Sequence, residues 1–292
     1  MKLSITTDFL NGTGCPREDL KYIAEGGFTH LHWCHQWCTD FLYSYHELAR
    51  IREWLKEFQL EILDIHGSAG KEKLWFSTEE YQRKAGVELV ANRIRMMEYL
   101  EVTGGLVMHI PGFRTDHTPQ QREEALARAA ALRRSLDELM PLLEKTGVKM
   151  AVENTGNDSY ELISALLREY PAKVFGTTYD SGHGNFGEGK GLDNLEKVKD
   201  RLYVLHLNDN SGEGDPHQPP FMGTVDWERL AGILADSPCK DKPYSFEIVM
   251  RNTPFFDQEA AVQTPENIRL FLKDAYERCV KFHNLAESCR KN

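Results

Sequence analysis

Histidines and carboxylates recur along this sequence at one kind of position, the end of a short apolar run. Six residues share this position: His66, His109, Glu153, Asp180, His206 and Glu247. A lone histidine there is ordinarily a hydrogen-bonded core residue, but six converging groups would leave several charges buried without partners, at a high cost in free energy. A bound cation relieves that cost, and mixed imidazole and carboxylate ligands suit Mn²⁺, Zn²⁺, Co²⁺ or Mg²⁺. The pattern therefore predicts a divalent-metal site where the runs end.

More residues with metal-ligating side chains lie close behind these run ends. His183 comes three residues after Asp180, and both Asp215 and His217 follow the run that ends at His206. We expect them to surround the same cavity, as ligands of further metal ions or as groups that bind substrate. The additional candidates of this kind are His66, His109, His183, Asp215 and His217.

The elements that must position these residues alternate between short β-branched runs and longer amphipathic runs. We predict strands at Leu3–Phe9, Phe28–Trp33, Glu61–His66, Leu106–Ile110, Lys149–Glu153, Val174–Asp180, Tyr203–Leu207 and Tyr244–Val249. We predict helices near residues 16–25, 45–58, 78–102, 119–145, 159–169, 192–200, 226–235 and 265–286. Eight strand–helix units imply parallel pairing with right-handed crossovers, and eight such units close into a barrel.

The expected fold is therefore a single α/β domain, a (β/α)₈ TIM barrel that occupies residues 1–292. A doubly wound open sheet is less favoured, because no glycine-rich phosphate turn follows the first strand. In a (β/α)₈ barrel the loops after the strands build the active site, so the strand ends converge there.

Several helix starts carry recognisable capping residues. Thr118 and Thr264 each precede a proline, which is favoured at the first helical position because its missing N–H is not needed there. Ser77 followed by Glu80 indicates a capping box, in which each side chain accepts a hydrogen bond from a backbone amide of the first turn.

The composition restricts the partners and the compartment. The chain has 45 acidic and 35 basic residues and a formal net charge of −10, so its surface repels phosphate backbones and no nucleic-acid partner is expected. No stretch approaches the roughly 18 apolar residues of a membrane span, and no secretory signal is visible, so we expect no membrane partner and a cytoplasmic location. The six cysteines form no disulfide pattern. The oligomeric state is left open, with a homo-oligomer among the expected arrangements.

The loops expected at the barrel mouth are poor in basic residues and rich in aromatic ones. Segments 34–46 and 208–224 contain no Lys or Arg. A protein that holds DNA needs basic contacts to phosphates, whereas aromatic walls suit the apolar faces of a sugar ring. We therefore predict a sugar or keto-sugar substrate without a phosphate group, bound in part by Trp33, Trp75 and Arg114.

The strand-end motifs and their order resemble the xylose isomerase-like TIM barrel superfamily over nearly the whole chain. That superfamily contains sugar isomerases and epimerases and also the apurinic endonuclease IV enzymes. In the ketose 3-epimerase branch four residues hold one metal ion, and they match Glu153, Asp180, His206 and Glu247 here. In the endonuclease IV branch three zinc ions use these four and five more, which match His66, His109, His183, Asp215 and His217. An arginine is expected in 3-epimerases where this chain has Asp-x-His, but sugar isomerase sequences carry that element as well.

By this resemblance the chain is expected to be a metal-dependent isomerase or epimerase that acts on carbohydrates. Such an enzyme moves a proton α to a carbonyl, and the metal ion stabilises the enediolate. The resemblance implies that Glu153 and Glu247 bind the metal and act as acid and base in turn. The alternative is a metal-dependent hydrolase or lyase of the endonuclease IV-like branch, such as a trinuclear zinc phosphodiesterase. A non-catalytic scaffold would be expected to lack some of the four central ligands, and all four are present.

Another group of metal-ligating residue types lies on and after the second predicted strand. His30, His32 and His35 stand near Cys34 and Cys38, but Cys-x₃-Cys is not the spacing of most structural zinc sites. A second, structural zinc is therefore not predicted there. A contact between His32 and the substrate is left open.

Overall fold

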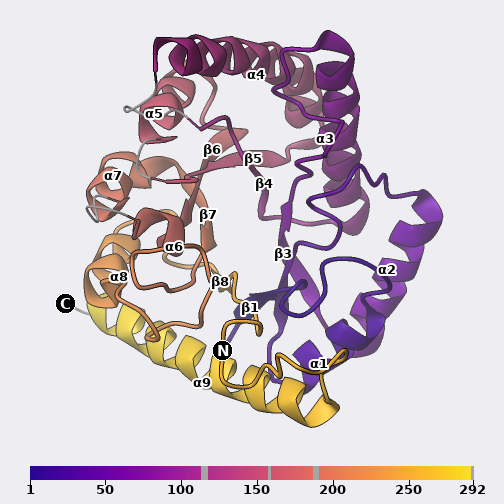
Figure 1. Ribbon diagram of the computed structural model, residues 1–292, viewed down its shortest axis with the longest axis vertical. Coiled ribbons are helices and arrows are strands. Elements are labelled where there is room, and N and C mark those ends of the chain that lie inside the picture. The colour runs from indigo at the N-terminus through magenta and orange to yellow at the C-terminus, as the bar shows by residue number, and fades with distance from the viewer. Residues whose placement is uncertain (113–117, 157–158, 187–190, 291–292) are drawn as a thin grey trace.

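The computed structural model describes residues 1–112, 118–156, 159–186 and 191–290, and it shows short parallel strands inside a ring of helices (Figure 1). The strands are β1 (Leu3–Thr6), β2 (His30–Trp33), β3 (Glu61–His66), β4 (Gly105–Met108), β5 (Lys149–Glu153), β6 (Phe175–Asp180), β7 (Leu202–His206) and β8 (Tyr244–Phe246). The helices are α1 (Arg17–Glu25), α2 (Tyr45–Phe58), α3 (Glu80–Leu100), α4 (Pro119–Thr146), α5 (Tyr160–Glu169), α6 (Ser181–Gly184), α7 (Gly191–Val198), the 3₁₀ helix η2 (Lys199–Arg201), α8 (Trp227–Ala235) and α9 (Pro265–Arg290).

The strands form one parallel sheet in the order β7-β6-β5-β4-β3-β2-β1-β8. Its two edge strands meet just beyond β7, where Leu207 forms a parallel bridge with Phe246. There the Leu207 N–H donates to the Ser245 carbonyl at 2.9 Å, and the Glu247 N–H donates to the Leu207 carbonyl at 3.1 Å. These bonds close the sheet into a nearly complete (β/α)₈ barrel, as predicted. We call this contact the β7–β8 seam, and it ties the neighbour of His206 to Glu247.

The interior of the barrel is apolar below the mouth on the side of β4, β5 and β7. Val107, Ala151 and Val204 pack together there and are buried. Because side chains alternate between the two faces of a strand, the residue two positions further along points to the same interior. Those residues are His109, Glu153 and His206. The strand period therefore brings all three to the mouth.

The opposite side of the interior, formed by β1, β2, β3 and β8, is polar. His32 on β2 pairs with Asp64 on β3, and both side chains are buried. On the neighbouring pair of strands, the Ser245 hydroxyl donates to the Ser4 hydroxyl at 3.4 Å. Buried polar groups of this kind are tolerated only when they are hydrogen-bonded, so this half of the barrel depends on paired side chains as well as on apolar packing.

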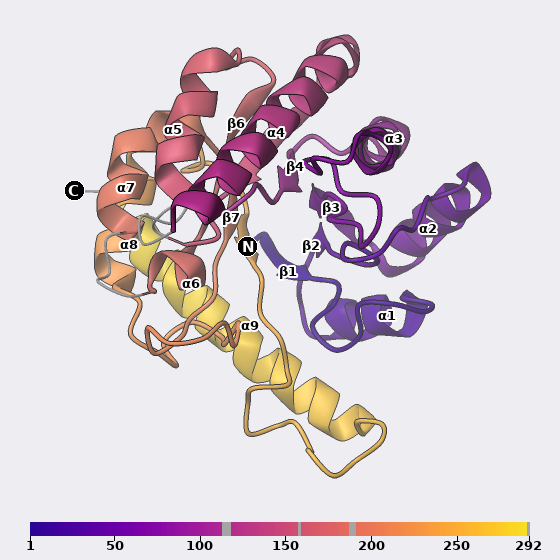
Figure 2. The ribbon, with the colours of Figure 1, turned by 45° about the horizontal axis from the view of Figure 1, so that its top comes forward.

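The helices cover the outer face of the sheet (Figure 2). The last helix, α9, supports the strand that leads to Glu247: Phe282 packs edge-on against Tyr244 and Phe246, with ring centroids 5.3 and 6.1 Å away. Aromatic pairs in this geometry add attraction beyond the area that they bury. In the described ranges, no helix combines the length and the apolar character that crossing a bilayer requires.

Two of the three predicted helix caps are confirmed. Thr118 and Gln121 form a capping box at the start of α4, and the Thr264 hydroxyl accepts a hydrogen bond from the Asn267 N–H at 3.1 Å. Each bond satisfies an amide that has no partner inside its helix.

The third predicted cap, the box formed by Ser77 and Glu80, is wrong. Helix α3 begins at Glu80 after an uncapped Glu79, so Ser77 lies two positions too early to cap it. The Ser77 hydroxyl instead accepts from the Glu79 N–H at 3.2 Å and donates to Gln82 Oε1 at 2.8 Å. The side chain orders the turn before the helix, and the helix start shifts by two residues.

Two helical glycines give opposite predictions for the same substitution. A Cβ on Gly86 of α3 would lie 2.3 Å from the Trp75 backbone nitrogen, whereas a Cβ on Gly232 of α8 would meet nothing within 4 Å. Alanine gains up to about 1 kcal/mol over glycine inside a helix. We therefore expect Gly232→Ala to raise the free energy of unfolding by about 0.5–1 kcal/mol. Gly86→Ala should lower it by about 1–3 kcal/mol, because α3 and the loop before it must separate.

Urea unfolding of the two variants beside the wild type measures both effects. A Gly86→Ala protein as stable as the Gly232→Ala protein would contradict the close contact between α3 and the Trp75 loop.

Candidate metal centre

Four side chains converge at the C-terminal mouth of the barrel. They come from the ends of β5, β6 and β7 and from the residue after β8, and they are Glu153, Asp180, His206 and Glu247. One ligand atom from each lies within 4.8 Å of those from the other three, and all four residues are buried. At the centre, His206 Nδ1 is 2.8 Å from Glu153 Oε1 and 2.8 Å from Glu247 Oε2.

The spacing of these atoms fits a metal ion. Ligands at 2.0–2.2 Å from one ion lie about 3 Å apart along the edges of its coordination shell. The two 2.8 Å separations around His206 Nδ1 are edges of this length. The other ring nitrogen, His206 Nε2, is buried and has no hydrogen-bond partner among the described residues, and the same holds for His217 Nε2. Buried nitrogens without partners are unusual in a folded protein, and His217 Nε2, which lies 3.9 Å from Glu247 Oε2, fits a site built for a cation.

Asp180 is held in place by two asparagines. Asn154 donates to the Asp180 carbonyl at 2.9 Å and accepts from the Asp180 N–H at 2.8 Å, while Asn208 Nδ2 donates to Asp180 Oδ2 at 2.7 Å. The other carboxylate oxygen, Oδ1, accepts from the His183 N–H at 2.6 Å and caps the short helix α6. These bonds fix the carboxylate, as groups around metal ligands commonly do.

Two outer groups flank the four central residues. On one side, His109 Nε2 and His66 Nε2 lie 3.1 and 3.8 Å from Glu153 Oε2. On the other side, His183 Nε2 lies 3.2 Å from Asp215 Oδ2. The ligand atoms of Asp180, His183 and His217 also lie within 4.8 Å of one another, as do those of His66, His109 and Glu153. The structure therefore brings all nine predicted metal-ligating residues to one mouth, and their binding of metal stays a prediction.

The charges of this cluster shift its pKa values strongly. Burial alone would raise the pKa of Glu153 and of Glu247, but the neighbouring imidazoles together outweigh it and hold both well below the ordinary value; His206 acts on both, with His109 beside Glu153 and His217 beside Glu247. Burial opposes the charged form of His206, yet the two carboxylates raise its pKa well above the ordinary value. Burial raises the pKa of Asp180 to about 6. Without a metal ion, His206 thus carries a proton at neutral pH.

The three predicted substrate-binding residues have different positions. Trp75 is buried and its indole N–H donates to the His109 carbonyl at 3.1 Å, next to the cluster. Trp33 is also buried, donates to the Tyr43 hydroxyl at 3.1 Å, and lines a pocket beside α2. Arg114 lies outside the described residues. The contacts of these residues with substrate stay predictions.

Other residues of the mouth were not predicted as site residues. The Trp37 ring, half-buried in the loop after β2, lies against His66 and His109, with centroids 4.5 and 5.2 Å away, and its loop position gave no periodic signal. Cys34 Sγ lies 3.5 Å from Glu247 Oε1. The alternation of side chains along a strand predicts that Cys34 points inward, because it follows His32 by two residues. The same alternation does not predict that Cys34 contacts Glu247, which lies 213 positions away in the sequence.

Comparisons with known proteins place these features in a family. A family model described as xylose isomerase-like TIM barrel matches residues 20–274. The uncharacterized protein y4fM of Sinorhizobium fredii is 29% identical over 256 residues, which cover 80% of this chain and 81% of y4fM. A D-psicose 3-epimerase solved in the presence of D-fructose has a TM-score of 0.72 at 14% identity, over 95% of this chain and 97% of its own. The IolI protein with a bound zinc atom has a TM-score of 0.66 at 16% identity, over 99% of each chain. At these identities the structural likeness shows a shared fold.

The protonation of His206 predicts how metal binding depends on pH. An ion bound by Glu153, Asp180, His206 and Glu247 must displace the His206 proton, because a metal ligand is a neutral imidazole. The free protein therefore holds more protons than the metal-bound protein, so metal affinity should rise with pH. Isothermal titration calorimetry with Mn²⁺ in buffers of different ionisation enthalpy should detect about one proton released per ion at pH 7.

Below pH 6 the protein should release more protons per ion, because Asp180, with a pKa of about 6, is then protonated as well. Binding without any proton release at pH 7 would show that His206 is not a ligand.

Proposed function

We propose that this chain, which belongs to the xylose isomerase-like TIM barrel family, is a divalent-metal-dependent isomerase or epimerase of a sugar or keto-sugar. One observation carries the proposal: the ligand atoms of Glu153, Asp180, His206 and Glu247 lie within 4.8 Å of one another at the barrel mouth. Two structural neighbours support it, a D-psicose 3-epimerase solved with D-fructose and the IolI protein with bound zinc. Mn²⁺, Zn²⁺, Co²⁺ and Mg²⁺ all suit such a ligand set.

When bound, the divalent ion would supply a Lewis acid that stabilises negative charge on the substrate oxygens. The proton transfer falls to Glu153 and Glu247, which approach His206 from β5 and from the end of β8. One carboxylate would take the proton from the carbon next to the carbonyl, and the other, after it has picked up a proton from solvent, would return that proton on the opposite side. Both have a pKa well below the ordinary value, so both are ionised before substrate arrives and either is able to act as the base.

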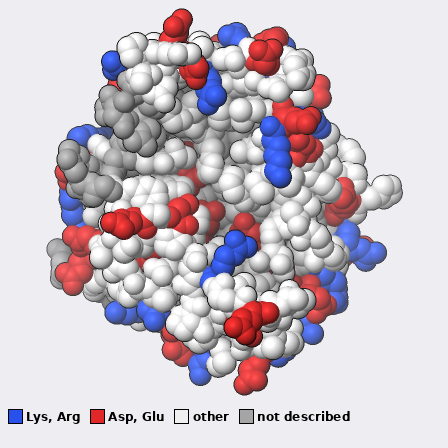
Figure 3. Space-filling model, in the orientation of Figure 1, with Lys and Arg blue, Asp and Glu red and all other residues white. Residues whose placement is uncertain are grey.

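The surroundings of the cluster suit a polyhydroxylated, uncharged substrate. The Trp37 ring offers an apolar face beside His66 and His109, and aromatic faces bind the apolar sides of sugar rings. His183 Nδ1 lies 2.9 Å from the Asn154 carbonyl oxygen and Nε2 lies 3.2 Å from Asp215 Oδ2, so a substrate hydroxyl that contacts His183 would replace the pairing with Asp215. On the face of the molecule shown in Figure 3, carboxylates reach the central hollow, a few Lys or Arg side chains stand at its edge, and most of its surroundings are uncharged. The formal net charge of −10 disfavours a phosphorylated substrate and nucleic acid.

The two outer groups favour a second candidate, a metal-dependent hydrolase or lyase of the endonuclease IV-like branch. His66 and His109 with Glu153, and His183 and His217 with Asp180, have the spacing for two more ions. Three ions would suit cleavage of a phosphodiester. The net charge of −10 and the base-free segments 34–46 and 208–224 disfavour a DNA substrate, so we place this function second.

Solvent exchange tests the proposed chemistry directly. In heavy water, with Mn²⁺ and a panel of neutral ketopentoses and ketohexoses, the enzyme should place deuterium on the carbon next to the carbonyl of its substrate. Glu153→Gln keeps the shape of the side chain but removes the base, so exchange should fall by about 10²–10⁴-fold. NMR of the recovered sugar measures it.

The matched control is Glu228→Gln, an exposed glutamate on α8, which should leave exchange unchanged. Metal analysis of both variants shows whether binding was kept. Incision of abasic duplex DNA, with no exchange in any sugar of the panel, would overturn the proposal in favour of the second candidate.

A further inference from the structure

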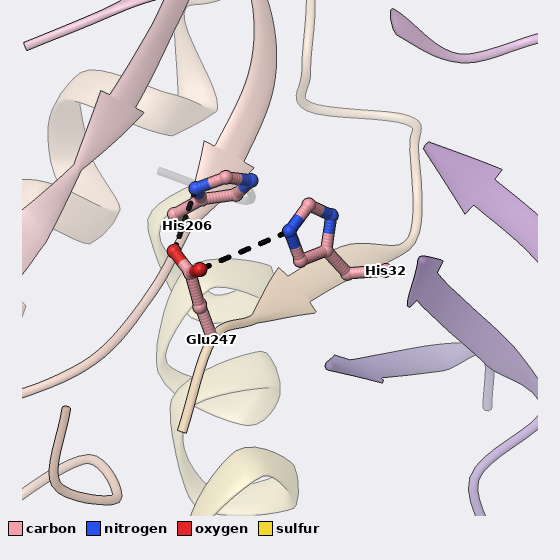
Figure 4. Close-up of side chains that lie close together, drawn as sticks. All are labelled: His32, His206 and Glu247. Carbon is pink, nitrogen blue, oxygen red and sulfur yellow. Dashed lines mark ion pairs between the residues drawn. The ribbon is translucent and has the colours of Figure 1, made fainter. Parts of the chain in front are cut away.

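A thiol, an imidazole and a carboxylate meet directly beside the four central ligands. His32 and Cys34 lie two residues apart on β2 and just after it, and both are fully buried. Cys34 Sγ is 3.2 Å from His32 Nε2 and 3.5 Å from Glu247 Oε1, and His32 Nε2 is 3.9 Å from the same oxygen. Figure 4 shows Glu247 between His32 and His206. One carboxylate therefore faces two clusters, with Oε2 toward His206 and Oε1 toward His32.

The imidazole of this cluster is held in the form that binds metal ions. Its Nδ1 pairs with the buried carboxylate of Asp64, so the ring proton lies on that side and the Nε2 lone pair faces Cys34. Metal-binding histidines characteristically donate their other N–H to a carboxylate or to a backbone carbonyl. His66 repeats the pattern, since its Nδ1 lies 2.8 Å from the Gly67 carbonyl oxygen. The ligand atoms of His66, Cys34 and Glu247 lie within 4.8 Å of one another.

We propose a second metal site, in which His32 Nε2, Cys34 Sγ and Glu247 Oε1 bind a zinc ion and His66 lies close enough to complete its shell. The ligand separations of 3.2, 3.5 and 3.9 Å lie within about 0.6 Å of the edges of roughly 3.3–3.6 Å that a tetrahedral zinc site with one sulfur requires. Glu247 would then offer Oε2 to the central ion and Oε1 to the second ion, as bridging carboxylates do in two-metal sites. On binding, the Cys34 thiol loses its proton to solvent and becomes a thiolate.

The two sites differ in the metal ions that they favour. The central site offers only nitrogen and oxygen ligands, whereas the proposed site contains a sulfur, which selects zinc or cobalt over magnesium or manganese. The second metal ion would bind whichever substrate the enzyme converts, and the experiment that detects it uses no substrate. The spacing of His32 and Cys34 alone gave no zinc motif, because the third ligand comes from the far end of the chain, after β8.

Cobalt substitution tests the second site without reference to activity. Titration of the reduced, metal-free protein with Co²⁺ should develop a thiolate-to-cobalt charge-transfer absorption in the near ultraviolet, which the central site is unable to produce because it has no sulfur. Cys34→Ser should abolish this absorption and lower the Co²⁺ content by one ion per chain. Cys279→Ser, which alters another fully buried thiol in α9, should change neither.

Two further measurements distinguish loss of the second metal site from loss of the central site and from misfolding of the Cys34→Ser variant. Asp180→Asn weakens the central site but should keep the charge-transfer band, so loss of the proposed function and loss of the second site are distinguishable. If Cys34→Ser fails to fold, X-ray absorption of the zinc-loaded wild type needs no variant and should detect a sulfur at about 2.3 Å from zinc. The absence of that sulfur, or a cobalt–thiolate band that persists in Cys34→Ser, would overturn the proposal.

Discussion

The arrangement of the barrel mouth follows from one contact, in which His206 Nδ1 lies 2.8 Å from a carboxylate oxygen of Glu153 and 2.8 Å from one of Glu247. Two buried carboxylates this close to a single nitrogen repel each other, and one imidazole N–H neutralises only part of their charge. Such a cluster is tolerable when a cation takes the remaining charge. The β7–β8 seam makes the contact unavoidable, because the Glu247 N–H is bonded to the residue after His206. The barrel closes only by bringing the two charged side chains together.

This constraint explains how the rest of the interior is divided. On the side of β4, β5 and β7, small apolar residues such as Val107 and Val204 fill the space below the mouth, and the charged groups stand above them. On the side of β1, β2, β3 and β8, polar residues continue further down, and Asp64 and His32 form a buried pair. Glu247 stands where the two halves meet. A carboxylate in that position is able to serve a central ion with one oxygen and a second ion with the other.

Much of this arrangement could be predicted from sequence, because it depends on local periods. The eight strands and the positions of residues such as Glu153 and Asp180 at their ends follow from alternation of apolar runs, and the barrel geometry then makes those ends converge. What could not be predicted depends on contacts between distant segments. The sequence gives no sign that Cys34 meets Glu247, or that Asp64 binds the ring of His32. The short helix α6 was also missed, since it is held by hydrogen bonds such as the Asp180 cap and the Asn210 contact with the Gly182 carbonyl, and not by a periodic apolar pattern.

The central claim is that Glu153, Asp180, His206 and Glu247 bind one divalent ion together. Anomalous diffraction from crystals of the protein grown with Mn²⁺ tests it most directly, because the signal locates the ion without an assumption about substrate. The account predicts a manganese peak within about 2.0–2.4 Å of one ligand atom from each of the four side chains. A peak elsewhere, or a mouth that stays free of manganese at saturating concentration, would contradict it.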